Sequence, residues 1–286
     1  MSFLNITPAP GADGVEAAAA RLIRAAVNRQ PCTPVRDLIG SADVGAAYAV
    51  QARLTAGRLA DGATIVGRKI GLTSPAVQAQ LGVDRPDFGV LFADMEISQG
   101  QVVEMGRLLQ PKVEAEIAFI LDRDLDNGSL DIESVRRAVA YAAPALEIVD
   151  SRIAGWDITF ADTVADNASS GLFVIGAERR TLNEFQPVAV TMSMRIDGRE
   201  VSTGIGSACL GDPLEALRWL AVTARDLGDP LRAGQVILSG ALGPMASVVA
   251  GNHVTAEIVG LGVVQARFAD GATPVRATST HLGEAA

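Results

Sequence analysis

The sequence predicts an α+β protein, in which a helical N-terminal portion packs on a larger, β-rich C-terminal portion. Apolar residues recur at helical spacing in the first quarter of the chain, and an alternation of period two begins at Val113. The composition, 49% hydrophobic and 20% charged over 286 residues, is sufficient for a full core. With no internal repeat and no linker-like composition break, we expect a helical portion at 1–64, a β-rich core at 65–268 and a flexible tail at 269–286.

The helical portion is predicted from spacing and end signals. Residues 1–14 are rich in Pro and Gly, and we expect them to be irregular. Residues 15–30 carry apolar positions at helical spacing, and Asp43–Ala60 forms a second helix that Gly62 ends. Ser74–Gly82 predicts a short helix, because Ser is a good N-cap, Pro fits the first position and Gly follows the end.

The rest of the chain consists mainly of predicted strands. In chain order they are Thr64–Leu72, Val113–Ile120, Ala145–Val149, 172–176, 187–196, 199–203, Val236–Ser239, Ser247–Ala250, His253–Val259 and Gly262–Phe268. Helices are expected from Asp131 to about Ala142 and from Asp212 to Leu227, since Asp is a good N-cap in both. The polar stretches Asp84–Gly89 and Asp162–Gly171 are expected to be loops.

Rare residues and charge exclude several classes of function. The net charge is −9 with no basic cluster, which argues against binding of nucleic acid or anionic lipid. Cys32 and Cys209 lie too far apart in the sequence for a zinc pair, a redox motif or a disulfide framework, and the histidines are only His253 and His281. A metal site would therefore use carboxylates, which favours Mg²⁺ or Mn²⁺ over zinc. No secretory signal or membrane span is recognisable, so the expected location is the cytoplasm.

Carboxylates in apolar strands are the first candidates for chemistry. Glu114 and Glu116 lie two positions apart on a predicted strand and share one face. If that face is buried the two charges repel, and a divalent cation is the simplest remedy; if it faces solvent, they are ordinary surface charge. Glu147 stands alone in the apolar segment 144–149 and needs a partner. That partner is either Arg152 or a metal shared with the other two glutamates.

Lys69 is the second candidate, because 22 of the 24 basic residues are Arg. A lysine inside a strand offers a tunable pKa, which burial or a nearby metal would lower, although an edge-strand surface lysine fits the pattern equally. Asp84, Asp87 and Asp94 are either catalytic loop residues or ordinary turn formers. The only other lysine, Lys112, has no assigned role.

Seven segments, taken together and in order, resemble the 2-keto-4-pentenoate hydratase family of the fumarylacetoacetate hydrolase-like superfamily. They are Gly67–Ser74, Gln80–Asp84, Pro86–Leu91, Gln110–Glu116, Pro144–Glu147, Asp162–Gly171 and Leu238–Met245. They fall within a match from about residue 30 to 268, which covers most of the chain. The resemblance implies a mixed β-sandwich roll with an N-terminal helical portion, assembled into a homo-oligomer.

The resemblance also implies roles for individual residues. Glu114, Glu116 and Glu147 match the ligands of one divalent metal, Mg²⁺ or Mn²⁺. Lys69 and Asp87 match the acid/base residues. The positions expected to contact the substrate are Leu72, Ser169, Ser239 and Gly240.

The implied activity is hydration of a short 2-hydroxy-2,4-dienoate, such as 2-hydroxypenta-2,4-dienoate, to 4-hydroxy-2-oxopentanoate. This reaction belongs to the meta-cleavage degradation of aromatic compounds. The alternatives are a metal-dependent decarboxylase of 2-oxo-3-enedioates such as 4-oxalocrotonate, a hydrolase of acylpyruvate C–C bonds, and a non-catalytic partner of a decarboxylase. The expected protein partners are the downstream aldolase or a decarboxylase.

Overall fold

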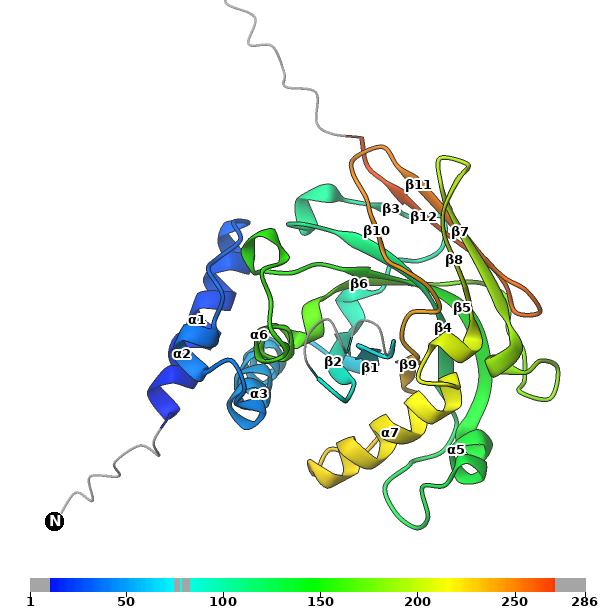
Figure 1. Ribbon diagram of the computed structural model, residues 1–286, viewed down its shortest axis with the longest axis horizontal. Coiled ribbons are helices and arrows are strands. Elements are labelled where there is room, and N and C mark those ends of the chain that lie inside the picture. Colours follow the sequence, from blue (N-terminus) through cyan, green and yellow to red (C-terminus); the bar gives the residue numbers. More distant parts are fainter. Residues whose placement is uncertain (1–10, 75–77, 79–82, 271–286) are drawn as a thin grey trace, which may run out of the picture.

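The computed structural model describes residues 11–74, 78 and 83–270. Within them, α1 (Ala12–Asn28), α2 (Arg36–Ile39) and α3 (Val44–Ala60) form a helical group at one side of the molecule (Figure 1). The Asp43 side chain accepts a hydrogen bond of 2.8 Å from Ala46 N and caps α3. These helices confirm the predictions for 15–30 and 43–60, but α1 begins at Ala12, within the segment 1–14 that was expected to be irregular. The helix expected after Ser74 lies largely outside the described residues.

The strands form two curled sheets. The larger has the order β2-β1-β9-β4-β5-β6 with β10 paired to β4, and only the β1–β9 pairing is parallel among the described residues. Its strands are β1 (Ile65–Gly71), β2 (Asp87–Phe92), β4 (Lys112–Leu121), β5 (Val139–Val149), β6 (Ser170–Ile175), β9 (Val236–Leu238) and β10 (Ala246–Ser247). The smaller has the order β3-β12-β11-β7-β8. It comprises β3 (Val102–Val103), β7 (Thr191–Ile196), β8 (Arg199–Ile205), β11 (His253–Ile258) and β12 (Gly262–Phe268).

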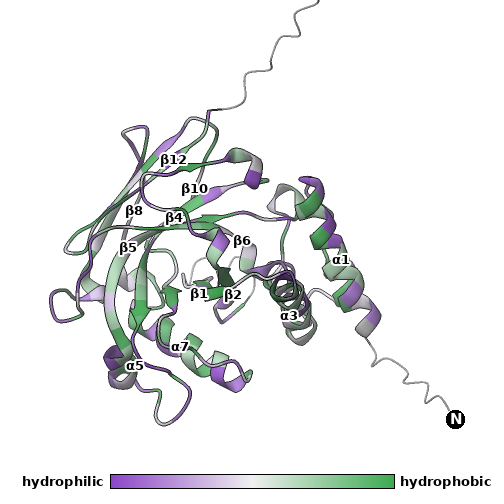
Figure 2. Ribbon diagram, turned by 180° about the vertical axis from the view of Figure 1, so that it is seen from behind, coloured by the Kyte–Doolittle hydropathy of each residue, from purple (hydrophilic) through white to green (hydrophobic). Residues whose placement is uncertain are grey.

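The main core lies where the larger sheet curls and packs on the smaller one. Strand β5 contacts both β11 and β12 across this boundary. The side chains of Ile117, Phe119 and Phe173 are fully buried there, and hydrophobic residues, green in Figure 2, follow the strands of the larger sheet. This arrangement is the mixed helix-and-sheet architecture that the sequence predicts.

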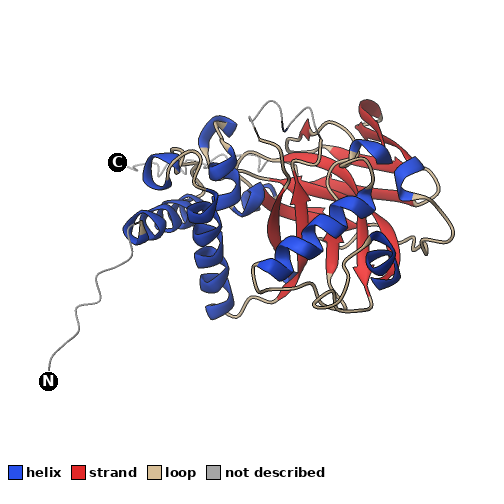
Figure 3. Ribbon diagram, turned by 60° about the horizontal axis from the view of Figure 1, so that its bottom comes forward, coloured by secondary structure: helices blue, strands red, loops and turns tan. Residues whose placement is uncertain are grey.

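Three further helices cover and connect the sheets: α5 (Ile132–Ala138), α6 (Phe160–Ala165) and α7 (Pro213–Asp226). Figure 3 shows α7 lying across the strands. Leu214, Leu217 and Leu220 on α7 are buried, and the Asp212 side chain accepts a hydrogen bond from Leu214 N as the N-cap. Short 3-10 helices link the elements: η1 (Ala93–Met95), η2 (Met105–Arg107), η3 (Ala154–Trp156), η4 (Asn167–Ser169), η5 (Pro187–Ala189) and η6 (Gly206–Ala208).

Several predicted boundaries are wrong. The expected loop Asp84–Gly89 contains the start of β2, whose six residues are all buried. The expected loop Asp162–Gly171 contains most of α6, all of η4 and the start of β6. The helix after Asp131 ends at Ala138 instead of Ala142, because the long β4–β5 ladder draws the Ala-rich segment that follows into a strand.

Smaller boundary errors occur in four predicted strands. The strand expected at 172–176 begins at Ser170, and 187–196 begins as a 3-10 helix. Of the predicted strand 247–250, only the first residue lies in a strand, β10. The strand expected at Ala145–Val149 extends back to Val139. No helix in the described part of the chain is long and apolar enough to cross a membrane.

The N-terminal helices share a hydrophobic cluster with α6, which comes from the middle of the chain. Asp162 on α6 joins the two parts. One of its carboxylate oxygens accepts hydrogen bonds from Val35 N and Arg36 N, both 2.9 Å, and the other accepts from Arg36 Nη1 at 2.8 Å and Thr159 N at 2.9 Å. The division of the chain at residue 64 stays a prediction, because the helical group and α6 pack as one cluster.

We expect Asp162→Ala to lower the free energy of unfolding by about 3–5 kcal/mol, because several buried donors would lose their acceptor. The matched control is Asp157→Ala, since Asp157 pairs with the same Arg36 but is 68% exposed, whereas Asp162 is 0% exposed. We expect that control to cost less than about 1 kcal/mol. Urea denaturation monitored by fluorescence measures both, and equal losses would contradict the anchoring role of Asp162.

Candidate active site

Three carboxylates meet on one face of the larger sheet. Glu114 and Glu116 lie two positions apart on β4, so their side chains point to the same face, and Glu114 is the register partner of Glu147 on β5. One oxygen from each of the three lies within 4.8 Å of the others. The structure therefore brings together the three residues that the sequence suggested as metal ligands.

These carboxylates are removed from water. Glu116 is 0% and Glu147 1% exposed, and Glu114 is half-buried. Burial raises the pKa of all three carboxyl groups. It raises the pKa of Glu147 to about 7. For Glu116, the neighbouring carboxylates of Glu147 and Glu114 raise the pKa further. Glu116 Oε1 and both oxygens of Glu147 have no hydrogen-bond partner among the described residues. The alternative of a solvent-exposed surface pair is thereby excluded.

A divalent cation fits this donor set. The three glutamates offer only oxygen ligands, which suit Mg²⁺, Mn²⁺ or Ca²⁺ and do not suit zinc. Arg152, the alternative partner that the sequence suggested for Glu147, is engaged elsewhere, because its guanidinium pairs with Asp166. Glu116 Oε1 and Glu147 Oε2 are thus free to coordinate an ion, whereas Glu147 Oε1 also faces Lys69 Nζ at 3.2 Å.

Two of the expected substrate-contact positions, Ser239 and Gly240, hold the strand that carries Glu116. Gly240 N donates a hydrogen bond of 2.7 Å to Glu116 Oε2, and a Cβ at Gly240 would overlap Thr73. Ser239 Oγ accepts from Ile117 N at 3.2 Å and donates to the Gly240 carbonyl at 3.1 Å. Their contact with a substrate stays a prediction. Gly240 orients the Glu116 carboxylate, and Ser239 fixes the backbone on either side of it.

Lys69 lies beside the carboxylates. Its Nζ is 3.2 Å from Glu147 Oε1 and donates a hydrogen bond of 2.9 Å to the Ala168 carbonyl. The side chain is 3% exposed, which excludes the surface alternative. Burial lowers the pKa of Lys69 as expected, but the four surrounding carboxylates raise it more, so the net direction is upward. The expected lowering is wrong for the protein without a bound cation, because four negative charges outweigh the loss of hydration.

Asp87 completes the group from the edge strand β2. It is the register partner of Gly71, so it shares a face with Lys69 two residues away, and a Cβ at Gly71 would overlap its Oδ1. Asp87 Oδ1 has no hydrogen-bond partner among the described residues, and burial raises the pKa of its carboxyl group. Thr163 Oγ1 donates to Asp87 Oδ2 at 3.4 Å and lies 3.2 Å from Ser169 Oγ.

Thr163, a neighbour of Asp87, is not among the candidates that the sequence indicates. It lies inside a stretch that was predicted to be a loop, and α6 carries it into the site. Recognition of the capping pattern at Thr159 and Asp162 would have predicted that helix and its inward face.

The segment after α6 makes an unusual turn. Asn167, Ala168 and Ser169 have φ angles of 55°, 51° and 52°, in the left-handed region that such residues rarely occupy. The Asn167 side chain holds the turn by accepting from Val90 N at 2.8 Å and donating to Val90 O at 3.0 Å. The turn aims the Ala168 carbonyl at Lys69 and places Ser169 beside Thr163. Leu72, the remaining expected contact position, also has a left-handed φ of 56°.

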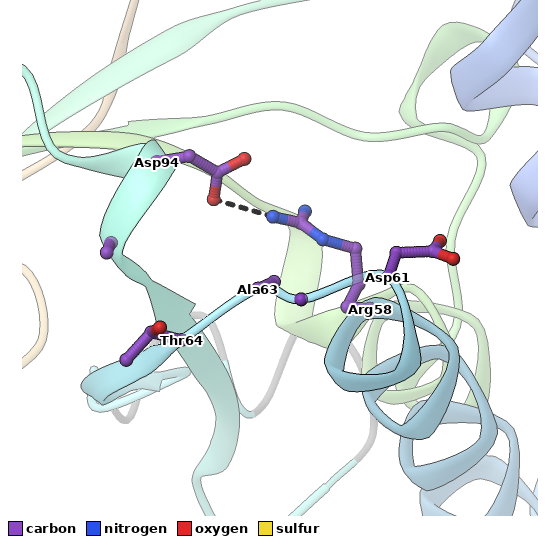
Figure 4. A pocket seen from close by; sticks show the side chains of 7 residues that line it. Arg58, Asp61, Ala63, Thr64 and Asp94 are labelled. Atoms are coloured by element: carbon purple, nitrogen blue, oxygen red, sulfur yellow. Dashed lines mark hydrogen bonds and ion pairs between the residues drawn. The ribbon is translucent and has the colours of Figure 1, made fainter.

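Two cavities lie outside this cluster. The smaller, of about 420 Å³, is shown in Figure 4, where Arg58 Nη2 lies 2.6 Å from Asp94 Oδ1. Asp94, a candidate from the sequence, is therefore neutralised by an arginine and stands apart from the carboxylate cluster. The larger cavity, of about 550 Å³, lies between α1, α3 and β6. None of the three glutamates lines either cavity.

Comparison with known proteins places this site in a family. Residues 64–269 match the family described as fumarylacetoacetate (FAA) hydrolase, C-terminal. The chain is 54% identical over 254 residues to a 2-keto-4-pentenoate hydratase of Dechloromonas aromatica, which covers 89% of this chain and 97% of that protein. It is 53% identical to the TodF product hydratase of Pseudomonas putida, over 82% of this chain and 88% of the relative.

A solved structure shares nearly the whole fold. The 4-oxalocrotonate decarboxylase of Pseudomonas putida, complexed with magnesium and adipate, superposes with a TM-score of 0.86 and 33% sequence identity. The alignment covers 92% of this chain and 100% of the decarboxylase.

The raised pKa values predict a pH-dependent response to metal. Because the buried glutamates retain protons that the unfolded chain loses, the stability of the metal-free protein falls as pH rises from about 4.5 to about 7. A bound cation offsets this loss, so Kd for Mg²⁺ is lower at pH 8, and we expect the same Mg²⁺ concentration to raise Tm more at pH 8 than at pH 6. At 100 times Kd the stabilisation is about 2.7 kcal/mol.

Thermal denaturation with and without Mg²⁺ at the two pH values measures this effect. Glu116→Gln should abolish the shift in Tm, whereas Glu257→Gln, an exposed position on β11, should retain it. An equal shift for the wild type at both pH values would contradict the link between proton release and metal binding.

Proposed function

The chain belongs to the 2-keto-4-pentenoate hydratase family, within the fumarylacetoacetate hydrolase superfamily, and we propose that it is a divalent-metal-dependent hydro-lyase. Its reaction is the addition of water to 2-hydroxypenta-2,4-dienoate, giving 4-hydroxy-2-oxopentanoate, in the degradation of aromatic compounds by meta-cleavage. The observation that supports this most directly is the cluster of three buried carboxylates with Lys69 and Asp87 at its side.

We assign Glu114, Glu116 and Glu147 as the residues that hold the metal, and Mg²⁺ or Mn²⁺ as the ion. The magnesium in the related decarboxylase supports this choice. When bound, the ion supplies a Lewis acid that attracts the carboxylate and the C2 oxygen of a 2-oxo acid and stabilises negative charge on that oxygen. Gly240 N keeps Glu116 oriented for this task through its hydrogen bond of 2.7 Å.

Lys69 and Asp87 carry the protons. Lys69 is buried with its Nζ 3.2 Å from Glu147 Oε1, beside the proposed metal ligands, which supports its role as the proton donor to C5. Asp87 presents an unpartnered oxygen and is held by Thr163, which supports its role in orienting and deprotonating the water that adds at C4. C3 is then protonated. The proton taken from water and the proton that leaves the 2-hydroxyl group replace the two given to C5 and C3, so the net change is the addition of one water molecule.

The decarboxylase alternative rests on a specific observation, the likeness over nearly the whole chain to 4-oxalocrotonate decarboxylase. That protein is 33% identical to the chain, whereas the hydratase relatives are 53–54% identical, which favours hydration. Cleavage of an acylpyruvate is the third candidate, and no contact in the site favours it.

The location of the enzyme, its assembly and its protein partners are also proposals. We propose a homo-oligomer in the cytoplasm, with the downstream aldolase or a decarboxylase as a partner. The exposed Val201 and Ile205 on the edge strand β8 support self-association, because apolar side chains on an unpaired strand edge favour pairing with another chain.

The decisive assay gives the purified protein 2-hydroxypenta-2,4-dienoate with Mg²⁺ or Mn²⁺. We expect loss of the dienol absorbance, formation of 4-hydroxy-2-oxopentanoate and no CO₂. Glu116→Gln should lower kcat by about 100-fold or more, because the site loses a metal ligand. Turnover only of a dicarboxylate, with release of CO₂, would establish the decarboxylase instead, and near-normal turnover by Glu116→Gln would contradict the metal site.

Lys69→Met tests proton transfer separately from metal binding. We expect the variant to keep the Mg²⁺-dependent rise in Tm and to lose about 10²- to 10⁴-fold in kcat, since the proton donor is absent. Rapid mixing with the dienoate measures turnover, and thermal denaturation provides the control for the fold. A variant with unchanged kcat across pH would exclude Lys69 as an acid/base residue.

A further inference from the structure

Lys112 is the second of only two lysines, and the proposed reaction leaves it without a task. It is the first residue of β4, and strand alternation places it on the same face as Glu114 and Glu116. Successive residues on that face are about 7 Å apart along the strand. Exposure increases in the same direction, because Glu116 is fully buried while Glu114 and Lys112 are half-buried. Lys112 thus lies at the open side of the metal site.

The two lysines flank the carboxylates. Lys69 pairs with Leu238 on β9, and Leu238 pairs with Ala118 on β4. The backbone of Lys69 therefore lies in the row of Ala118, six residues along β4 from Lys112, and its Nζ reaches Glu147 Oε1 at 3.2 Å. Lys69 occupies the deep end of the site, and Lys112 occupies its outer end.

Trp156 holds the Lys112 side chain. Lys112 Nζ lies 4.2 Å from the centroid of the indole ring, which is a cation–π contact. The ring is fixed in turn, because its Nε1 donates a hydrogen bond of 3.0 Å to the Gln110 carbonyl, while Gly155 N donates to Gln110 Oε1 at 2.7 Å. Trp156 also has a left-handed φ of 57°, so the backbone adopts a rare conformation to place this ring.

The ammonium group keeps its charge unneutralised. No carboxylate oxygen of the described residues forms an ion pair with Lys112 Nζ. Glu114 is only two residues away, and the charge of Lys112 acts to lower the pKa of its carboxyl group. An aromatic face attracts a cation without cancelling its charge. In a chain of net charge −9, an unpaired cation beside the metal ligands is suited to an anionic ligand.

We propose that Lys112, held by Trp156, binds the carboxylate of the substrate at the mouth of the site. This inference rests on the proposed function and adds a specificity residue to it. The reacting carbons must face Lys69 and Asp87 at the deep end, so the carboxylate end of the substrate points towards the outer end. The ligand class is a monoanionic 2-oxo or 2-hydroxy acid that also binds the metal.

The proposal predicts two effects of opposite sign. Removing the positive charge of Lys112 weakens the binding of an anion and strengthens the binding of a cation at Glu114. A merely structural role would weaken both, because a distorted site binds neither ligand well. The signs of the two changes therefore separate the proposed role from a loss of structure.

Calorimetry with Mn²⁺ and then with pyruvate tests Lys112→Met in the full chain. We expect Kd for pyruvate to rise by about 10-fold or more, and Kd for Mn²⁺ to stay equal or fall. KM for the dienoate should rise by a similar factor, with kcat within about threefold of wild type, and Lys112→Arg should restore most of the pyruvate affinity. An unchanged Kd for pyruvate, or weaker binding of both ligands, would overturn the proposal.

Trp156 variants test the clamp. Trp156→Phe should keep the affinities near those of wild type, because a ring remains. Trp156→Leu should free the ammonium to pair with Glu114, so that both Mn²⁺ and pyruvate bind more weakly. Adding Lys112→Met to that variant should restore the Mn²⁺ affinity, whereas a distorted site would stay weak. Wild-type affinities in Trp156→Leu would show that the ring does not position Lys112.

Binding of pyruvate does not require turnover, so the two proposals fail separately. A wild-type protein that binds Mn²⁺ and pyruvate but does not hydrate the dienoate contradicts the proposed function, while the Lys112 comparison still decides the inference. A Mn²⁺-loaded wild-type protein that binds no pyruvate overturns the inference, whatever the activity assay shows.

Discussion

Glu114 and Glu147 face each other across the β4–β5 ladder, and Glu116 lies one step further along the same face. Three negative charges within 4.8 Å and largely out of water repel one another, and few hydrogen bonds compensate them. The neighbouring groups respond to this constraint. Lys69 brings a positive charge, Gly240 N donates to one carboxylate, and the oxygens left over are suited to a divalent ion.

The groups that support these charges come from backbone in uncommon conformations. The left-handed turn at Asn167–Ser169 directs a carbonyl at Lys69, and glycines at 71 and 240 leave room for Asp87 and Thr73. Strain of this kind persists only where the surroundings hold it. Here α6 precedes the strained turn, and the buried Asp162 anchors α6 to the N-terminal helices. The helical portion therefore stabilises the site without contributing a metal ligand to it.

The chain is similar in sequence to hydratases and in structure to a decarboxylase, so the fold alone does not select the reaction. Selection falls to the groups at the two ends of the site. At the deep end lie Lys69 and Asp87, which we propose as the proton carriers, and at the outer end Lys112 on Trp156 offers a single fixed cation. A substrate with one carboxylate satisfies that cation, while its reactive carbons remain in the dry interior.

Local sequence determined the features that depend on a few neighbouring residues. The alternation from Val113 was enough to place two glutamates on one face, and capping residues were enough to locate α3 and α7. It could not show that the face is buried, since the same alternation describes an exposed surface. The family resemblance supplied Lys69 and Asp87 as acid/base residues, and their roles stay predictions.

Tertiary structure decided the rest, because those features depend on residues distant in the chain. Asp87 belongs to a strand only because β1 pairs with it, and Thr163 reaches Asp87 across 76 positions. The pKa of Lys69 is raised because four carboxylates from three strands surround its ammonium group. The segment around Lys69 alone predicts that burial lowers this pKa, which is the wrong direction. A sequence pattern predicts on which face of a strand a side chain lies. Only the packing of that face determines the neighbours of the side chain and its charge state.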